Sequence, residues 1–138
     1  MKRSRRFPAE PAAVPAARRF AAGVLDGCDE ETAQAAVLMV SELATNCILH
    51  AGGGFKLAIS RGKQEIRVEA SDQRGGQPQM RSPAPTDPHG RGLRIVDALA
   101  SAWGVEHHSR QGKTVWFTLA LPAGAGGASR SPAAAART

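Results

Sequence analysis

Residues 37–50 have the sequence VLMVSELATNCILH, and this run indicates the central element of the fold. Its apolar residues fall on almost every side of a helix, which is typical of a helix buried in a core. Glu42 and Asn46 interrupt the run with i, i+4 spacing, so they share one helix face. Because an unpaired polar group among apolar neighbours costs about 1–3 kcal/mol, and a charge costs more, both side chains need partners.

Two interpretations of the Glu42 and Asn46 pair are open. In the first, the two side chains cap or cross-link neighbouring backbone, or lie at a solvated edge. In the second, they form the floor of a metal and phosphate site. Asn46 then offers Mg²⁺ a neutral oxygen ligand, and Glu42 acts as a base or positions a water molecule.

The sequence around this run predicts the remaining helices and strands. The central helix is expected to begin after Asp29, a good N-cap, and to end at about His50, before a glycine-rich stretch. A preceding helix is expected over Pro15–Leu25, and residues 72–91, which hold four prolines, are expected to form a long loop. Apolar alternation and turn residues predict the other elements, namely strands Phe55–Ser60, Glu65–Ser71, Val105–Ser109 and Thr114–Leu121, and a helix Gly92–Ala102.

This order of elements predicts the fold class. The strands come as two hairpins, so the sheet is expected to be mostly antiparallel, with the helices on one face. The expected fold is therefore an α+β, two-layer sandwich. We expect one domain over residues 15–122, flanked by a disordered basic arm over residues 1–14 and a disordered low-complexity tail over residues 123–138.

The charge of the chain narrows the class of partner. The 138 residues include 18 Lys and Arg against 12 Asp and Glu, a net charge of +6. All of the excess lies in residues 1–6 and 123–138, and residues 7–122 are balanced. Charged ends of this kind are usually solvated, and aromatic residues make up only 4% of the chain, so we expect no direct binding of nucleic acid.

Cysteine usage and apolar runs bear on the compartment. Cys28 and Cys47 form no metal-binding or CxxC spacing, which favours a reduced, cytoplasmic protein. No uninterrupted apolar run approaches the ~20 residues of a membrane span, so no membrane association is expected.

Two further signals follow the central run. Asp72 closes an alternating strand, where an Asp is most often a turn or cap residue, although its carboxylate is also able to accept from an exocyclic amine such as that of adenine. Gly90-Arg91-Gly92-Leu93 enters the third helix, and glycines there let backbone amides approach an anion. Many loops end in glycine before a helix, so this second signal alone is weak.

Taken in order, these signals resemble a known family. Residues 41–46 (SELATN), Asp72, residues 90–93 (GRGL) and residues 112–117 (GKTVWF) resemble the boxes of the histidine-kinase-like ATPase domain, the Bergerat fold of gyrase, histidine kinases and heat-shock chaperones. The small stand-alone branch of anti-sigma-factor serine/threonine kinases is the most similar. The resemblance covers about residues 15–121.

The resemblance implies the ligands and the role of each residue. ATP and Mg²⁺ are the implied cofactors, with Glu42 as catalytic base, Asn46 as the Mg²⁺ ligand and Asp72 as the partner of the adenine amino group. Thr114 would support the adenine side through a water molecule, and residues 77–89 would form a lid. The implied nucleotide-binding residues are Asn46, Asp72, Gly76, Gly90, Arg91, Gly92, Leu93 and Thr114.

The resemblance also implies a function, with one alternative. The chain is expected to be an ATP-dependent protein serine/threonine kinase that phosphorylates a STAS-type anti-sigma-factor antagonist and also binds a sigma factor. No histidine precedes His50, so the phosphoryl acceptor is another protein or water, and kinases of this branch are often homodimers. Arg74 stands where the family pattern Asp-x-Gly-x-Gly has its first glycine, which favours the alternative of a non-catalytic module that switches a protein partner.

Overall fold

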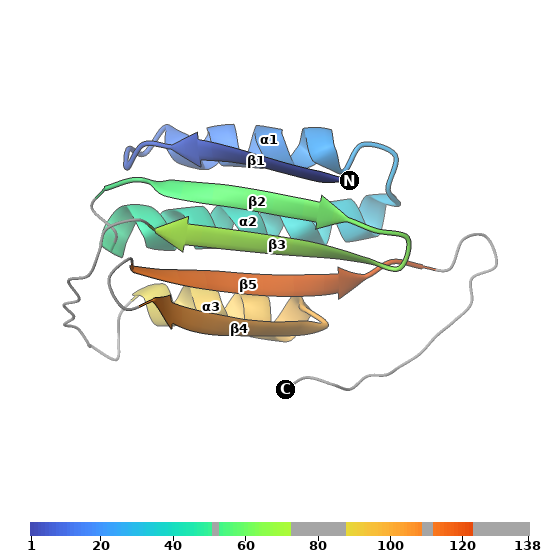
Figure 1. Ribbon diagram of the computed structural model, residues 1–138. Helices are drawn as coiled ribbons and strands as arrows, with labels where there is room; N and C mark the ends of the chain where they lie inside the picture. Colours follow the sequence, from blue (N-terminus) through green and yellow to red (C-terminus); the bar gives the residue numbers. More distant parts are fainter. Residues whose placement is uncertain (51–52, 73–87, 109–111, 123–138) are drawn as a thin grey trace.

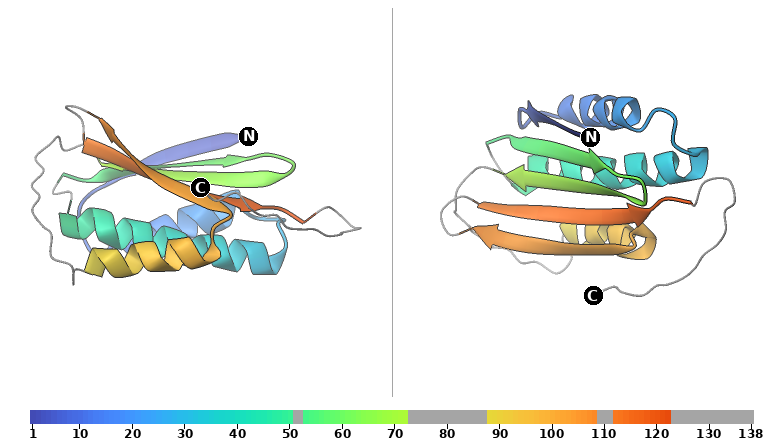
Figure 2. Two further views of the ribbon diagram at one scale, coloured as in Figure 1. Left: turned by 90° about the horizontal axis from the view of Figure 1, so that it is seen from below. Right: turned by 45° about the vertical axis from the view of Figure 1, so that its right-hand side comes forward.

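The fold is a five-stranded antiparallel sheet with three helices on one of its faces (Figures 1 and 2). The computed structural model describes residues 1–50, 53–72, 88–108 and 112–122, of which residues 50 and 88–93 by backbone alone. The sheet has the strand order β1-β2-β3-β5-β4. Its elements are β1 Lys2–Phe7, α1 Ala13–Val24, α2 Glu30–His50, β2 Phe55–Arg61, β3 Glu65–Asp72, α3 Pro88–Leu99, β4 Ala102–His108 and β5 Gly112–Ala120. The expected two-layer α+β sandwich is confirmed.

The central helix α2 forms as its sequence predicts. The Asp29 carboxylate accepts hydrogen bonds from the backbone N–H of Thr32 at 3.1 Å and from its hydroxyl at 3.0 Å, which satisfies a free donor of the first turn. Glu30 and Glu31 follow in the first turn, where negative charge is favourable. After the helix, Gly54 adopts φ 94°, a conformation that glycine reaches without strain.

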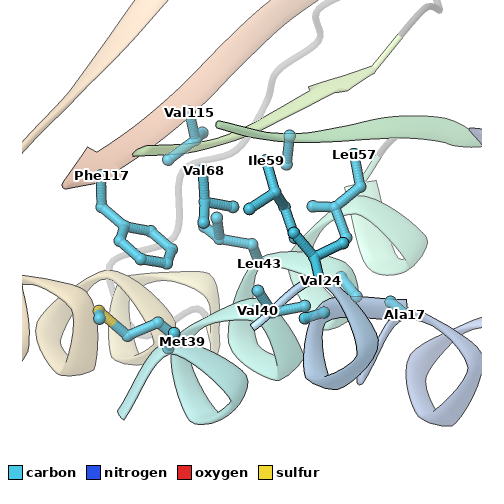
Figure 3. Close-up of a cluster of buried hydrophobic side chains, with 14 of the residues drawn as sticks. Ala17, Val24, Met39, Val40, Leu43, Leu57, Ile59, Val68, Val115 and Phe117 are labelled. Carbon is cyan, nitrogen blue, oxygen red and sulfur yellow. The ribbon is translucent and has the colours of Figure 1, made fainter. Parts of the chain in front are cut away.

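The core lies between the sheet and the helix layer (Figure 3). Alternate residues of β2, β3 and β5 point toward the helices, and α2 provides Met39, Val40 and Leu43 on its sheet side, all at most 1% exposed. Ala17 of α1 is fully buried, so its small side chain lets α1 lie close against the core.

Helix α2 is buried on one side only, which corrects the expectation of a helix buried all round. Leu38 and Leu49 are 45% and 54% exposed, and Glu42 and Asn46 between them are half-buried. The buried side of α2 therefore borders a side that is open to solvent and carries Glu42 and Asn46. By length and composition alone the segment Glu30–Leu49 would be able to cross a membrane, and its buried residues belong to the core of the sandwich.

Residues 2–7 form a strand, where the sequence had indicated a disordered arm over residues 1–14. β1 pairs with β2 along its whole length, from Lys2 opposite Ser60 to Phe7 opposite Phe55. Phe7 is 4% exposed and stacks on Phe55 with ring centroids 5.3 Å apart. Backbone pairing and one buried aromatic side chain therefore hold a strand whose other residues are polar and exposed. The expected tail at residues 123–138 lies outside the described residues.

The other element boundaries shift by a few residues. α1 begins two residues before the expected Pro15. α3 begins at Pro88 rather than Gly92 and ends at Leu99, so β4 begins at Ala102. Proline is well tolerated in the first turn of a helix, where its missing N–H would have no partner, and this explains the earlier start of α3.

Candidate functional site

One end of the sandwich gathers most of the residues that the sequence analysis singled out. The C-terminal ends of α2 and β3 and the N-terminal ends of α3 and β5 all lie on the left in Figure 1. These four ends carry Asn46, Asp72, residues 90–93 and residues 112–114 respectively. Segments far apart in the sequence are thus brought to one edge of the molecule.

Glu42 and Asn46 lie on the open side of α2. Both side chains are half-buried, and exposed Leu38 and Leu49 flank them on that side. Both interpretations of the pair stay open, namely a cap, cross-link or solvated edge, and the floor of a site. In either, the half-buried carboxylate and amide are reached from solvent.

Asp72 ends β3 on the face of the sheet that the helices cover. It pairs with Phe55, whose ring is 2% exposed in the core, and directly paired residues point to the same side. Its half-buried carboxylate therefore projects toward the helix layer.

Gly112 makes room for Asp72. It adopts φ 88°, and a Cβ atom built on it would lie 2.5 Å from the Asp72 carbonyl oxygen and closer still to the carboxylate. Real Cβ atoms do not approach other atoms to less than 3.0 Å. A side chain at position 112 would consequently displace the end of β3, which gives a physical reason for glycine at the start of this motif.

Cys47 connects Asp72 to α2 electrostatically. The pKa of the Cys47 thiol is raised from 9.0 to about 12, chiefly by burial and also by the negative charge of Asp72, while the positive charge of Lys113 opposes the shift. Cys47 therefore stays protonated at neutral pH and is not a nucleophile. The coupling also shows that Asp72 and Lys113 both lie near the segment of α2 that carries Asn46.

The sequence predicted no role for Lys113 or Cys47 at this end of the molecule, although the motif at residues 112–117 includes Lys113. Lys113 pairs with His107 across β4 and β5, on the helix-facing side of the sheet, one residue away from Thr114. The signal was present in the alternation of β5, where the core residues Val115 and Phe117 place Lys113 on their own face.

Thr114 points away from Asp72. It pairs with Ser71, so its side chain lies on the outer face of the sheet. Its hydroxyl lies 2.8 Å from the Ser71 hydroxyl and 3.0 Å from Nε2 of His108. The expectation that Thr114 supports the adenine side therefore stays a prediction, and Asp72 and Thr114 occupy opposite faces of the sheet.

The glycine boxes are described only in part. The backbone places Gly90, Arg91, Gly92 and Leu93 within α3, near its N-terminus, and not in a loop before it. The first turn of a helix has free N–H groups that favour anions, so this position still suits phosphate. Gly76, Arg74 and the expected lid over residues 77–89 lie outside the described residues, apart from the first two residues of α3.

The site has the donor chemistry for a nucleotide with Mg²⁺. Among the described residues no group of three His, Cys, Asp or Glu side chains is placed to hold a metal ion. Mg²⁺ is usually held by one or two protein oxygens together with substrate phosphates and water. The amide oxygen of Asn46 fits that limited role, and the half-buried carboxylate of Asp72 fits an exocyclic amine.

A sandwich of this topology, with these polar groups at one end, fits a nucleotide-binding domain. Comparison with protein-family models gives the specific family. The chain belongs to the histidine kinase-like ATPase domain family, whose model matches residues 7–119. Membership implies ATP as the ligand, and phosphoryl transfer is common in the family. A comparison with curated proteins found no match.

Proposed function

We propose that this chain is an ATP-dependent protein serine/threonine kinase that regulates a sigma factor by phosphorylating a STAS-type antagonist. The observation that carries the proposal is the convergence of Asp72, Gly112 and the α2 segment with Asn46 at one end of the sandwich. The family match supports ATP as the phosphoryl donor.

Each group has a defined task in this proposal. Asp72 accepts a hydrogen bond from the adenine amino group, which orients the base. Asn46 holds Mg²⁺, which neutralises charge on the phosphates, and the backbone amides at the start of α3 hold phosphate oxygens. Glu42, four residues before Asn46 on the open side of α2, takes the proton from the acceptor hydroxyl. Phosphoryl transfer mainly needs this positioning and charge neutralisation.

The proposed acceptor is a serine or threonine of a separate regulatory protein, as for kinases of the branch that the sequence resembles. We also propose a cytoplasmic location and a homodimer, as for kinases of the branch that the sequence resembles.

Labelled ATP with a co-encoded STAS-type protein tests the kinase function. We expect wild type to transfer label, Asn46→Ala to lose transfer about a hundredfold or more, and Glu42→Gln to lose transfer while still binding Mg·ATP. Thr45→Ala is the matched control, because Thr45 is exposed on the same helix and its hydroxyl donates only to the Ser41 carbonyl at 2.9 Å. Equal labelling by wild type and Asn46→Ala contradicts the proposed site.

The alternative function is a regulatory module that switches a protein partner without phosphorylating it. Arg74, in place of the first glycine of the Asp-x-Gly-x-Gly pattern, favours it. Titration calorimetry with Mg·ATP separates the two functions. Binding without transfer to any candidate acceptor supports a nucleotide-gated module, and no binding at about 1 mM ATP supports a module that has lost the nucleotide.

A further inference from the structure

The positive charge of the molecule is concentrated on one lateral edge. β1 is the outermost strand of the sheet, and α1 contacts α2 at the same side of the helix layer (Figure 1). Residues 1–25, which form these two elements, contain six basic residues and one acid, Glu10. Residues 88–108, which form the opposite edge, contain two Arg, one Asp and one Glu. Four of the six excess positive charges, those of residues 1–6, therefore lie on this edge.

The basic residues of this edge are open to solvent on both sides of β1. Lys2, Arg3, Arg5 and Arg6 are all exposed. The register places Lys2 and Arg6 on the outer face of the sheet and Arg3 and Arg5 on the helix-facing side. The guanidinium of Arg5 lies 5.1 Å from the ring centroid of Phe7, an arrangement that orients it. α1 adds exposed Arg18 and Arg19.

β1 also has backbone groups that face outward. Met1 and Arg61 exchange two backbone hydrogen bonds, from Arg61 N to the Met1 carbonyl at 2.8 Å and from Met1 N to the Arg61 carbonyl at 3.3 Å. Hydrogen-bonded and non-hydrogen-bonded residue pairs alternate along an antiparallel ladder, so the backbone groups of Arg3 and Arg5 also bond to β2. The N–H and C=O groups of Lys2, Ser4 and Arg6 then point away from β2. Within the described residues, no strand pairs with that side of β1.

An open edge with unpaired N–H and C=O groups accepts an additional strand. Charged residues on edge strands, lysine above all, also serve to prevent edge-to-edge aggregation. This edge has four charges on β1, three of them arginine, and two more on α1. Arginine pairs with carboxylates through two parallel hydrogen bonds, so this composition repels copies of the same edge and attracts acidic chains.

We propose that the free edge of β1 binds an extended acidic segment of a protein partner, which adds to the sheet as a sixth strand. Backbone hydrogen bonds to Lys2, Ser4 and Arg6 hold the segment, and its alternating carboxylates, which share one face, pair with the basic side chains on that face. The site lies at the edge of the sheet and does not depend on nucleotide binding. A peptide is favoured over a nucleic acid because only a peptide satisfies the outward N–H and C=O groups.

The experiment uses the full chain and a blocked peptide of ~8 residues that alternates glutamate with threonine, a length typical of a strand. Ser4→Pro is the decisive variant. Proline removes the outward N–H of position 4 and is tolerated on edge strands when the N–H is not needed for the ladder. Ser4→Ala is the matched control, because it removes the same hydroxyl and keeps the N–H. Thermal unfolding of both variants verifies that β1 still pairs with β2.

We expect the peptide to bind wild type and Ser4→Ala within twofold of each other, and Ser4→Pro at least about tenfold more weakly. Binding should weaken as the salt concentration rises from about 50 to about 500 mM. Hydrogen exchange should slow at the Lys2, Ser4 and Arg6 amides when the peptide is present. A lysine-threonine peptide of the same length should not bind.

Three outcomes would overturn the proposal. The first is peptide binding that is equal in Ser4→Pro and wild type, which makes the edge a nonspecific basic patch. The second is tighter binding of a DNA duplex of ~20 base pairs, or of phosphatidylserine vesicles, that Ser4→Pro leaves unchanged. The third is the absence of peptide binding at about 1 mM.

Discussion

Replacing Gly112 by alanine tests whether Asp72 is the adenine contact. The new Cβ would lie 2.5 Å from the Asp72 carbonyl oxygen, below the 3.0 Å that real Cβ atoms keep, so the end of β3 must move by at least the difference, about 0.5 Å. Hydrogen-bond lengths span a range of about 0.5 Å, so a shift of this size is enough to break a hydrogen bond of the Asp72 carboxylate to adenine. A hydrogen bond involving a charged group contributes about 1.5–3 kcal/mol, so we expect Mg·ATP to bind roughly ten- to a hundredfold more weakly.

Gly27→Ala provides the matched control. Gly27 has φ 92°, close to the 88° of Gly112, but a Cβ there meets only the far end of the Arg61 side chain, at 3.6 Å. Both variants should therefore lose about 1–2 kcal/mol of stability from backbone strain, and only Gly112→Ala should lose nucleotide affinity. Titration calorimetry gives the dissociation constants, and urea unfolding gives the stabilities. If Gly112→Ala binds Mg·ATP as tightly as Gly27→Ala does, Asp72 does not hold the adenine.

Two further predictions concern single side chains. Cys47, with a pKa of about 12, should react with iodoacetamide at pH 8.5 roughly a thousandfold more slowly than a free thiol. Because its pKa is raised from 9.0 in the folded state, Cys47 should also stabilise the fold below pH 9. That contribution should be lost as the pH rises toward 12. A native-state alkylation time course measures the first effect, and reaction at the rate of a free thiol would show that the thiol is not buried. Arg61→Met should lower the free energy of unfolding, measured in urea, by about 2–4 kcal/mol. Nη1 of Arg61 donates to the carbonyls of Val24 at 3.0 Å and Asp26 at 2.8 Å, and the substitution leaves both carbonyls without this donor. A loss below about 0.5 kcal/mol would mean that these carbonyls are satisfied in another way.

The elements that the sequence predicted best are those with an apolar period and a cap. α2 was predicted from its first residue to its last, because Asp29 caps it and apolar residues fill its length. β2 and β3 were predicted to within one residue, because apolar alternation over Glu65–Ser71 and the turn before it define the hairpin. In these segments local preference and tertiary packing favour the same structure.

β1 was not predicted because the interactions that make this segment a strand are not local. Five of its six residues are exposed, and it has no apolar period, so its sequence is equally suited to a solvated arm. What makes it a strand is the free edge of β2, a segment about 50 residues later in the chain. Only Phe7 carried a signal, and one buried aromatic residue is too little to predict a strand.

The site could be predicted as a set of residues, but the face to which each one points could not. The motif at residues 112–117 contains both Lys113 and Thr114, and a shift of one residue in the pairing of β5 would exchange their faces. The pairing of Ser71 with Thr114 fixes the face, and the left-handed conformation of Gly112 beside Asp72 starts the strand there. Lys113 consequently lies on the side of Asp72 and Cys47. The electrostatic environment of the adenine end therefore depends on strand register, which no motif records.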